Sequence, residues 1–140
     1  QMINKKPFEL HIKAIEANDV PKMDGLGKSD PFLTFELNTT HQKWKTKVID
    51  NTTKPSWNEE FHLPISADLS DVLTITLLDF DDVSKNDLIS TKVFKVRDFK
   101  LGEVHDEIYN FDPAPKVKNG ANVRLVFHLD DWKKEPFVSA

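Results

Sequence analysis

The sequence contains no cysteine and no apolar run of transmembrane length. Without cysteine there can be no disulfide, thiol nucleophile, iron–sulfur cluster or thiolate zinc site, and such a chain suits the cytosol. The first residues lack the pattern of a signal peptide. A net charge of -4 and a pI of about 5.7 argue against a general nucleic-acid binder, which would normally be basic. We therefore expect a cytoplasmic protein that does not bind nucleic acid.

The length and composition fit one domain. The 140 residues include 39% hydrophobic and 30% charged residues, the ordinary balance of a globular protein with its own core. No repeat, low-complexity tract or linker divides residues 1–140. We expect a single domain with a strand core over about 7–132, a short C-terminal tail and a monomeric state.

Short segments with a period of two dominate the chain, and no long segment has a helical period. Alternating apolar and polar residues are typical of half-buried strands, and turn-forming clusters separate the segments. Regular short strands of this kind predict an all-β sandwich or barrel. The residues 96–107 are predicted to form a long connection. The eight predicted strands are Phe8–Ala14, Leu33–Leu37, Trp44–Ile49, Phe61–Ile65, Leu73–Leu77, Ile89–Val96, Ile108–Phe111 and Val123–Leu129.

Two of the predicted loops are rich in aspartate. Asp24 and Asp30 lie between the first and second predicted strands, and Asp79, Asp81 and Asp87 lie between the fifth and sixth. Loops held by a rigid scaffold can bring polar groups together. Calcium takes about 6–8 oxygen ligands, mainly carboxylates, carbonyls and water. The two loops therefore predict a calcium site.

The prediction depends on the two loops meeting at the same end of the sandwich. Two carboxylates about 4 Å apart repel by about 4 kcal/mol at an effective dielectric constant of 20, so a converging set favours a bound cation. The simpler interpretation is that each aspartate belongs to a solvated turn, where its side chain caps the local backbone. The combination of the two loops favours the metal.

Four segments of the sequence resemble the C2 domain family, which includes modules of protein kinase C and the synaptotagmins. Asp24–Asp30, followed by proline, is similar to the first calcium loop of that family, and Asp79–Asp87 is similar to the third. Between them, Lys45–Lys47 and Pro55–Phe61 resemble two connecting segments of the family, in order. The resemblance implies an eight-stranded antiparallel β-sandwich, with type II strand order and calcium-binding loops at one end.

The resemblance also implies a ligand set and a function. Calcium would be the cofactor, and anionic phospholipids such as phosphatidylserine would be the partners, so that the module is recruited reversibly to membranes. The loop-tip residues Leu26 and Val83 are predicted to enter the membrane interface. The implied calcium ligands are the side chains of Asp24, Asp30, Asp79, Asp81, Asp87 and Ser84 and the backbone carbonyls of Met23, Phe80 and Lys85.

A second lipid site is predicted on a basic strand. Lys43, Lys45 and Lys47 alternate, so all three face the same side of a strand. Near an anionic surface each lysine contributes about 1 kcal/mol, and in the C2 family a basic strand at this position can bind phosphoinositides. A solvated strand face that discourages edge pairing explains the lysines equally well.

The spacing of the histidines predicts neither a metal site nor a catalytic site. The five histidines have no metal-ligand or catalytic-triad spacing, and His11, His62 and His128 are predicted to face outward from strands.

Two other functions stay open. One is a calcium-stabilised protein-interaction module that does not bind lipid directly, or that binds a protein partner through the lysine strand. A metal-dependent hydrolase is the weaker alternative, because no general base or nucleophile accompanies the aspartates. We therefore expect a module without catalytic activity.

Overall fold

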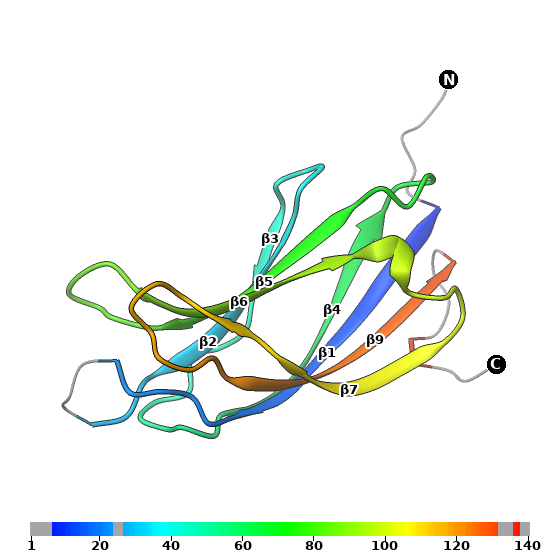
Figure 1. Cartoon of the computed structure of the whole chain (residues 1–140). Helices are drawn as coiled ribbons and strands as arrows, with labels where there is room; N and C mark the ends of the chain where they lie inside the picture. The colour runs from blue at the N-terminus through cyan, green and yellow to red at the C-terminus, as the bar shows by residue number, and fades with distance from the viewer. Residues whose placement is uncertain (1–6, 24–26, 132–135, 138–140) are drawn as a thin grey trace.

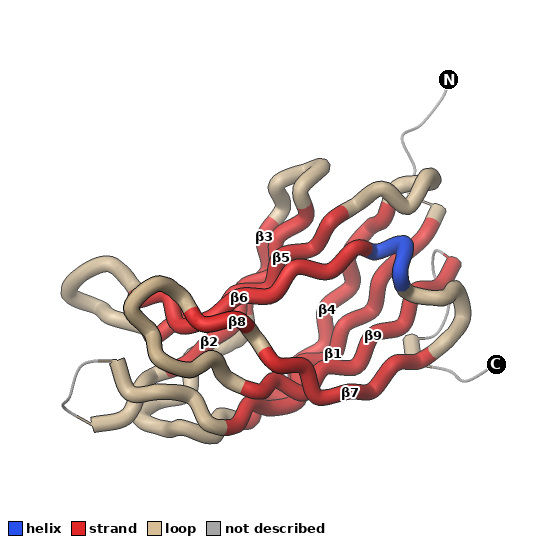
Figure 2. Tube along the Cα trace, viewed as in Figure 1, coloured by secondary structure: helices blue, strands red, loops and turns tan. Residues whose placement is uncertain are grey.

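The chain folds into two antiparallel sheets that pack face to face as a sandwich (Figure 1, Figure 2). This computed structural model describes residues 7–23, 27–131 and 136–137. One sheet has the order β4-β1-β9-β7 and the other β3-β2-β5-β6-β8. The predicted all-β sandwich is confirmed. The strands are β1 (Phe8–Asn18), β2 (Pro31–Leu37), β3 (Lys43–Lys45), β4 (Ser56–Ile65), β5 (Val72–Asp79), β6 (Asp87–Lys95), β7 (Val104–Asn110), β8 (Asp112–Pro113) and β9 (Asn122–Asp131).

All eight predicted strands are present, and the two-residue strand β8 is added to them. The strand β7 begins at Val104, inside the predicted connection, because its mostly exposed residues give no apolar alternation for the sequence to reveal. The strand β3 ends at Lys45 rather than Ile49. The hydroxyl of Thr46 accepts the N–H of Leu33 at 3.0 Å, so a side chain replaces the next bond of the ladder.

The core follows from the alternation that the sequence shows. Along β5 the side chains of Leu73, Ile75 and Leu77 are fully buried between the sheets, and the intervening residues are only partly covered. Successive side chains of a strand point to opposite faces, so a single strand supplies one core row. At the edge of the sandwich the rings of Phe35 and Phe61 meet across the two sheets, with centroids 4.7 Å apart.

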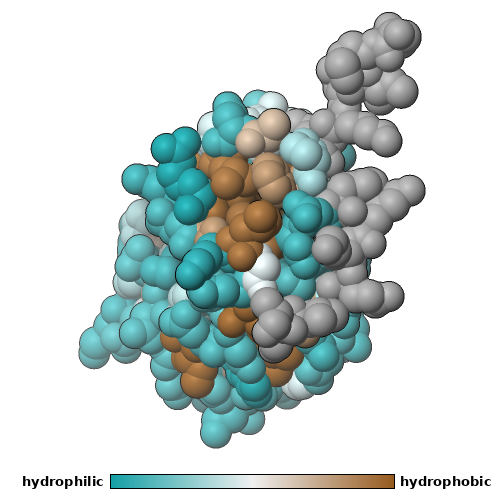
Figure 3. All heavy atoms as spheres, turned by 90° about the vertical axis from the view of Figure 1, so that its right-hand side faces the viewer, coloured by the Kyte–Doolittle hydropathy of each residue, from teal (hydrophilic) through white to brown (hydrophobic). Residues whose placement is uncertain are grey.

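The loops with aspartates lie at one end of the sandwich. The described parts of the β1–β2 connection and the β5–β6 loop are both at the left in Figure 1. The opposite end is shown in Figure 3, where hydrophilic residues surround an apolar area. The two ends of the molecule therefore differ in chemistry.

Two of the histidines that were predicted to face outward do so, but they are buried. His11 and His128 are 1% and 0% exposed, whereas His62 is exposed. Because Leu10 and Ile12 point into the core, His11 lies on the outer face of its sheet. There the ring of Phe137 lies 6.0 Å from the ring of His11 and 6.2 Å from that of His128. The direction was right, but later residues of the chain cover the face.

Helical structure in the described residues is limited to the 3-10 turn η1 (Val96–Asp98). Across the described part of the chain, therefore, no helix has the length and apolar character that crossing a bilayer requires.

Replacing Phe127 with alanine is expected to lower the free energy of unfolding by about 3–5 kcal/mol. The side chain is fully buried, and its ring centroid lies 4.5 Å from that of Phe99 and 5.0 Å from that of Phe94. Urea denaturation measures the change. The control is Val93→Thr, which keeps a β-branched side chain at a position that is 57% exposed and should change stability by less than about 0.5 kcal/mol. A loss below about 1 kcal/mol for Phe127→Ala would contradict the packing described.

Candidate calcium site

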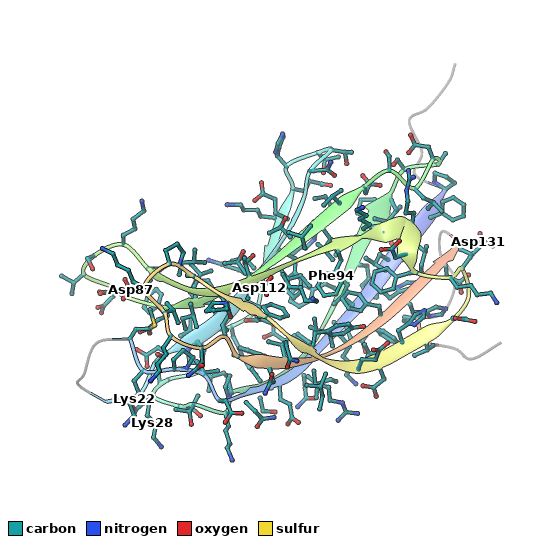
Figure 4. All side chains as sticks on the ribbon, in the orientation of Figure 1. Lys22, Lys28, Asp87, Phe94, Asp112 and Asp131 are labelled. Atoms are coloured by element: carbon teal, nitrogen blue, oxygen red, sulfur yellow. The ribbon has the colours of Figure 1, made fainter. Side chains whose placement is uncertain are left out.

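A pocket of about 310 Å³ lies among the loops at the acidic end of the sandwich. Figure 4 shows Lys28 and Asp87 at this end of the molecule. The pocket gathers residues from three separate segments of the chain. One segment precedes β2, one follows β3, and one joins β5 to β6. Its lining consists of Lys28, Asp30, Asp50, Asp79, Phe80, Asp81, Asp82 and Asp87.

Asp79 occupies the centre of this arrangement because it ends the inward-facing row of β5. It follows Leu77 at the alternate position and is 7% exposed. It pairs with Pro31 of β2 on one side and with Asp87 of β6 on the other. The register between β5 and β6 shifts between Leu77 and Leu78, an irregularity typical of strands that redirect side chains near a site. The alternation of buried residues along β5 therefore places the Asp79 carboxylate at the end of the sandwich.

Asp30 is tied to Asp79 and to the segment that follows β3. The backbone N–H of Asp30 donates to Oδ1 of Asp79 at 2.8 Å, and the N–H of Phe80 donates to the carbonyl of Asp30 at 2.9 Å. Oδ1 of Asp30 accepts the N–H of Asn51 at 2.6 Å. These bonds fix three loops relative to one another.

Asp50 is a pocket residue that sequence reasoning missed. The side chain of Asn51 accepts the N–H of Lys28 at 2.9 Å, and the N–H of Thr52 donates to the carbonyl of Ser29 at 2.9 Å. These contacts hold the residue before Asn51 beside the aspartate loops. The only signal in the sequence was a single aspartate just after a predicted strand, which is also what an ordinary turn contains.

Asp81 sits in a tight turn that keeps its carboxylate ionised. Oδ1 accepts the N–H groups of Val83 at 2.8 Å and Ser84 at 3.1 Å, and Oδ2 accepts the Ser84 hydroxyl at 2.9 Å. The hydrogen bond from Val83, followed by those from Ser84, lowers the pKa of Asp81 below its usual value. The carboxylate is thus charged at neutral pH and suited to a hard cation.

The structure brings four predicted aspartates, Asp30, Asp79, Asp81 and Asp87, to one pocket, and the fifth, Asp24, lies outside the described residues. Asp82 also lines the pocket and was not among the predicted ligands.

The other predicted positions are less close to the pocket lining. Phe80 is part of it, and Ser84 contacts it through Asp81. Met23 instead borders a neighbouring hollow together with Asp87, and Lys85 is exposed. Val83 is 90% exposed, and Leu26 lies outside the described residues.

The predicted basic strand is only partly a strand. Lys43 and Lys45 belong to β3 and border a hollow of about 360 Å³ with residues of β2 and β5. Lys47 lies beyond the end of β3, although it is exposed like the other two. Nζ of Lys43 lies 3.8 Å from Oε1 of Glu36. Exposed ion pairs of this kind contribute little, so the lysines keep most of their capacity to attract anions.

The donor set of the pocket fits a hard divalent cation. Six aspartates and one lysine give its lining a formal charge of -5. Carboxylate oxygens are the ligands that calcium prefers, and a lining with this net negative charge attracts a cation. The lining offers no imidazole or thiolate, so it does not favour a softer metal.

Comparison with known proteins identifies relatives over most of the chain. A family model described as C2 domain matches residues 8–111. Cytosolic phospholipase A2 delta of Mus musculus is 30% identical over 105 residues, which cover 74% of this chain and 13% of that protein. The chain thus spans only a small part of the length of this curated relative.

Solved structures share the fold. A single C2 domain of a plant extended synaptotagmin 1 superposes with a TM-score of 0.81 at 20% identity, covering 94% of this chain and 100% of that chain. A two-domain fragment of extended synaptotagmin 2, described as calcium bound, gives a TM-score of 0.75 at 26% identity and covers 89% of this chain and 46% of that one.

Asp82→Asn is expected to stabilise the protein when divalent cations are removed by a chelator. The substitution removes one charge from the acidic lining, so the free energy of unfolding should rise by a few tenths of a kcal/mol. Thermal unfolding measures it, and the gain should disappear in about 1 M NaCl, where the Debye length is about 3 Å. Glu107→Gln, which neutralises an exposed residue of β7 in the other sheet, is the control. Equal stabilisation by both variants would indicate an effect of net charge and not of the pocket.

Proposed function

Because this chain belongs to the C2 domain family, we propose that it is a membrane-targeting module that binds anionic phospholipids when its aspartate pocket holds calcium. The observation that carries the proposal is the gathering of six aspartates from three segments around one pocket. The relative described as calcium bound supports the choice of ion. The module would be cytoplasmic, recruited reversibly to membranes, and without catalysis of its own.

The calcium ligands we propose are the side chains of Asp30, Asp79, Asp81 and Asp87, together with that of Asp24, which lies outside the described residues. The ordered turn around Asp81 and the hydrogen bonds between Asp30 and Asp79 support this set, because they hold carboxylates in place before the ion arrives. When bound, calcium supplies positive charge and coordination positions for lipid phosphate oxygens.

Charge reversal at the loops explains how calcium would control the affinity for membranes. The lining carries a formal charge of -5, which repels an anionic bilayer. Two calcium ions bring +4 and make this end of the molecule nearly neutral, so that open coordination positions face the membrane. Lys28 at the rim adds a positive group that suits the same surface.

Val83 supports a shallow insertion at the tip of the β5–β6 loop. It is an apolar residue that is 90% exposed, next to the turn built by Asp81. Complete burial of a valine contributes about 1.5–3 kcal/mol, which suits reversible attachment. Leu26 in the first loop is proposed for the same role.

Calcium-dependent sedimentation with phosphatidylserine vesicles tests the proposal. The protein should move to the vesicle pellet with calcium and stay in solution with chelator. The double substitution Asp79→Asn and Asp81→Asn should abolish this shift, because it removes two charges while each amide oxygen still accepts the backbone N–H groups that Oδ1 accepts.

Glu107→Gln is the matched control and should sediment like the unmodified protein. Calcium binding by calorimetry without any movement onto vesicles would overturn the lipid proposal and favour the calcium-stabilised protein-interaction module. Sedimentation that persists in the double variant would show that the aspartate pocket is not the site.

We also propose that Lys43, Lys45 and Lys47 bind phosphoinositide headgroups. The hollow beside Lys43 and Lys45 supports this, since it is large enough to receive a phosphate group over β3, β2 and β5. Phe32 borders the same hollow and offers no hydroxyl, so the lysines would provide the main attraction.

Changing these three lysines to alanine should weaken binding to phosphoinositide vesicles by at least about tenfold, because each contributes about 1 kcal/mol. Binding to phosphatidylserine with calcium should change much less. The control replaces Lys95, Arg97 and Lys100, three exposed cations around η1, with alanine. Equal losses on both lipids, or equal losses in both triple variants, would indicate nonspecific attraction instead.

A further inference from the structure

Three histidines stand side by side across the outer face of the four-stranded sheet. His11 of β1 pairs in register with His62 of β4 and with His128 of β9. Two residues earlier on β1, Glu9 lies on the same face as His11. None of these residues lines the aspartate pocket, and their strands are not in the sheet that contains Asp79 and Asp87. Spacing along the chain does not reveal this row, because each histidine comes from a different strand.

The atoms of Glu9, His11 and His62 converge on one point. The two Nδ1 atoms of His11 and His62 are 2.7 Å apart, and Oε1 of Glu9 lies 3.6 Å from the first and 4.0 Å from the second. The point that is equidistant from these three atoms lies about 2.1 Å from each, inside the triangle that they form. That distance matches the zinc–nitrogen and zinc–oxygen bonds found in proteins, about 2.0–2.2 Å.

The described hydrogen bonds of His11 do not account for its burial. It is 1% exposed, and its Nε2 has no hydrogen-bond partner among the described residues, so its polar contacts there are confined to Nδ1. Burying an imidazole with so few partners is costly. Imidazole nitrogen is a common zinc ligand, so a bound metal would give this buried ring a strong partner.

His128 has a different part in this row. Its Nδ1 accepts the N–H of Phe137 at 2.5 Å, which places the ring proton on Nε2 when the ring is neutral. Nε2 lies 3.0 Å from Oδ2 of Asp130. Nε2 makes no hydrogen bond within the described residues despite this distance, and His128 is not among the residues whose ligand atoms converge, although its ring centroid is 5.5 Å from that of His11.

We propose that Glu9, His11 and His62 form a binding site for a transition-metal ion of the zinc class, separate from the aspartate pocket. Two imidazole nitrogens and one carboxylate oxygen suit zinc, which commonly leaves a fourth position for water. Calcium prefers oxygen ligands and is disfavoured at this site. The ion reaches it from the solvent past His62, whose side chain is 43% exposed.

In the metal-free protein the two Nδ1 atoms share one proton, because at 2.7 Å one ring must donate to the other. When the metal binds, the ring that donated carries its proton on Nε2 instead of Nδ1, so both Nδ1 lone pairs face the ion and both rings stay neutral. The two rings then separate slightly, since ligands at a tetrahedral angle lie about 3.3 Å apart. His62 is on the edge strand β4 and is free to make this movement.

Calorimetric titration of zinc chloride into the calcium-saturated protein tests the proposal. One zinc ion should bind per chain. His62→Ala should weaken binding at least about tenfold, and Glu9→Gln should weaken it by a smaller factor. Both positions are partly exposed, whereas His11 is too deeply buried for its replacement to be an unambiguous test. The visible absorption of cobalt bound in place of zinc should report nitrogen ligands and be lost in His62→Ala.

The matched control is His41→Asn, which removes a histidine whose side chain is 79% exposed and puts asparagine, tolerant of positive φ, at φ 58°. This variant should bind zinc normally, and so should the protein with Asp79 and Asp81 changed to asparagine. The absence of zinc binding, or an unchanged affinity in His62→Ala, would overturn the proposal. Loss of zinc binding in the aspartate variant would place the ion in the other pocket and overturn it equally.

Discussion

The period of two along β5 is the constraint on which the rest of this structure depends. The row Leu73, Ile75 and Leu77 builds the centre of the core, and its next member is Asp79. The alternation that buries the leucines therefore also places the Asp79 carboxylate at the end of the sandwich. The strand cannot turn this side chain away from the pocket without breaking its pairing with β2 and β6. The close packing of the core thereby limits the movement of the Asp79 carboxylate.

Asp79 favours a bound cation because other aspartates share its pocket. Asp79 alone would be a satisfied residue at a strand end, since it accepts the N–H of Asp30. Asp30, Asp50 and Asp81 lie around the same pocket and make it an arrangement that favours a cation. The hydrogen bonds that fix the loops stabilise the arrangement in advance, so less free energy is lost to ordering when the ion binds.

The two sheets carry different cation chemistry. The aspartate pocket lies at one end of the sandwich and offers carboxylate oxygen, whereas the row of His11, His62 and His128 lies on the outer face of the four-stranded sheet and offers nitrogen. A hard ion and a zinc-class ion would be sorted by ligand type without competing for one place. A sandwich can present two such surfaces because its core occupies only the inner face of each sheet.

The sequence by itself determined the eight main strands, the inward rows and the two aspartate loops, because these depend on local alternation and on turn-forming residues. The tertiary structure alone decided that Asp50 joins the pocket, since its position depends on bonds between Asn51 and residues some twenty positions earlier. It also decided that His11 is buried and that His62 lies beside it, fifty-one positions away. Strand pairing of this kind brings distant residues into register, and no spacing along the chain reveals it.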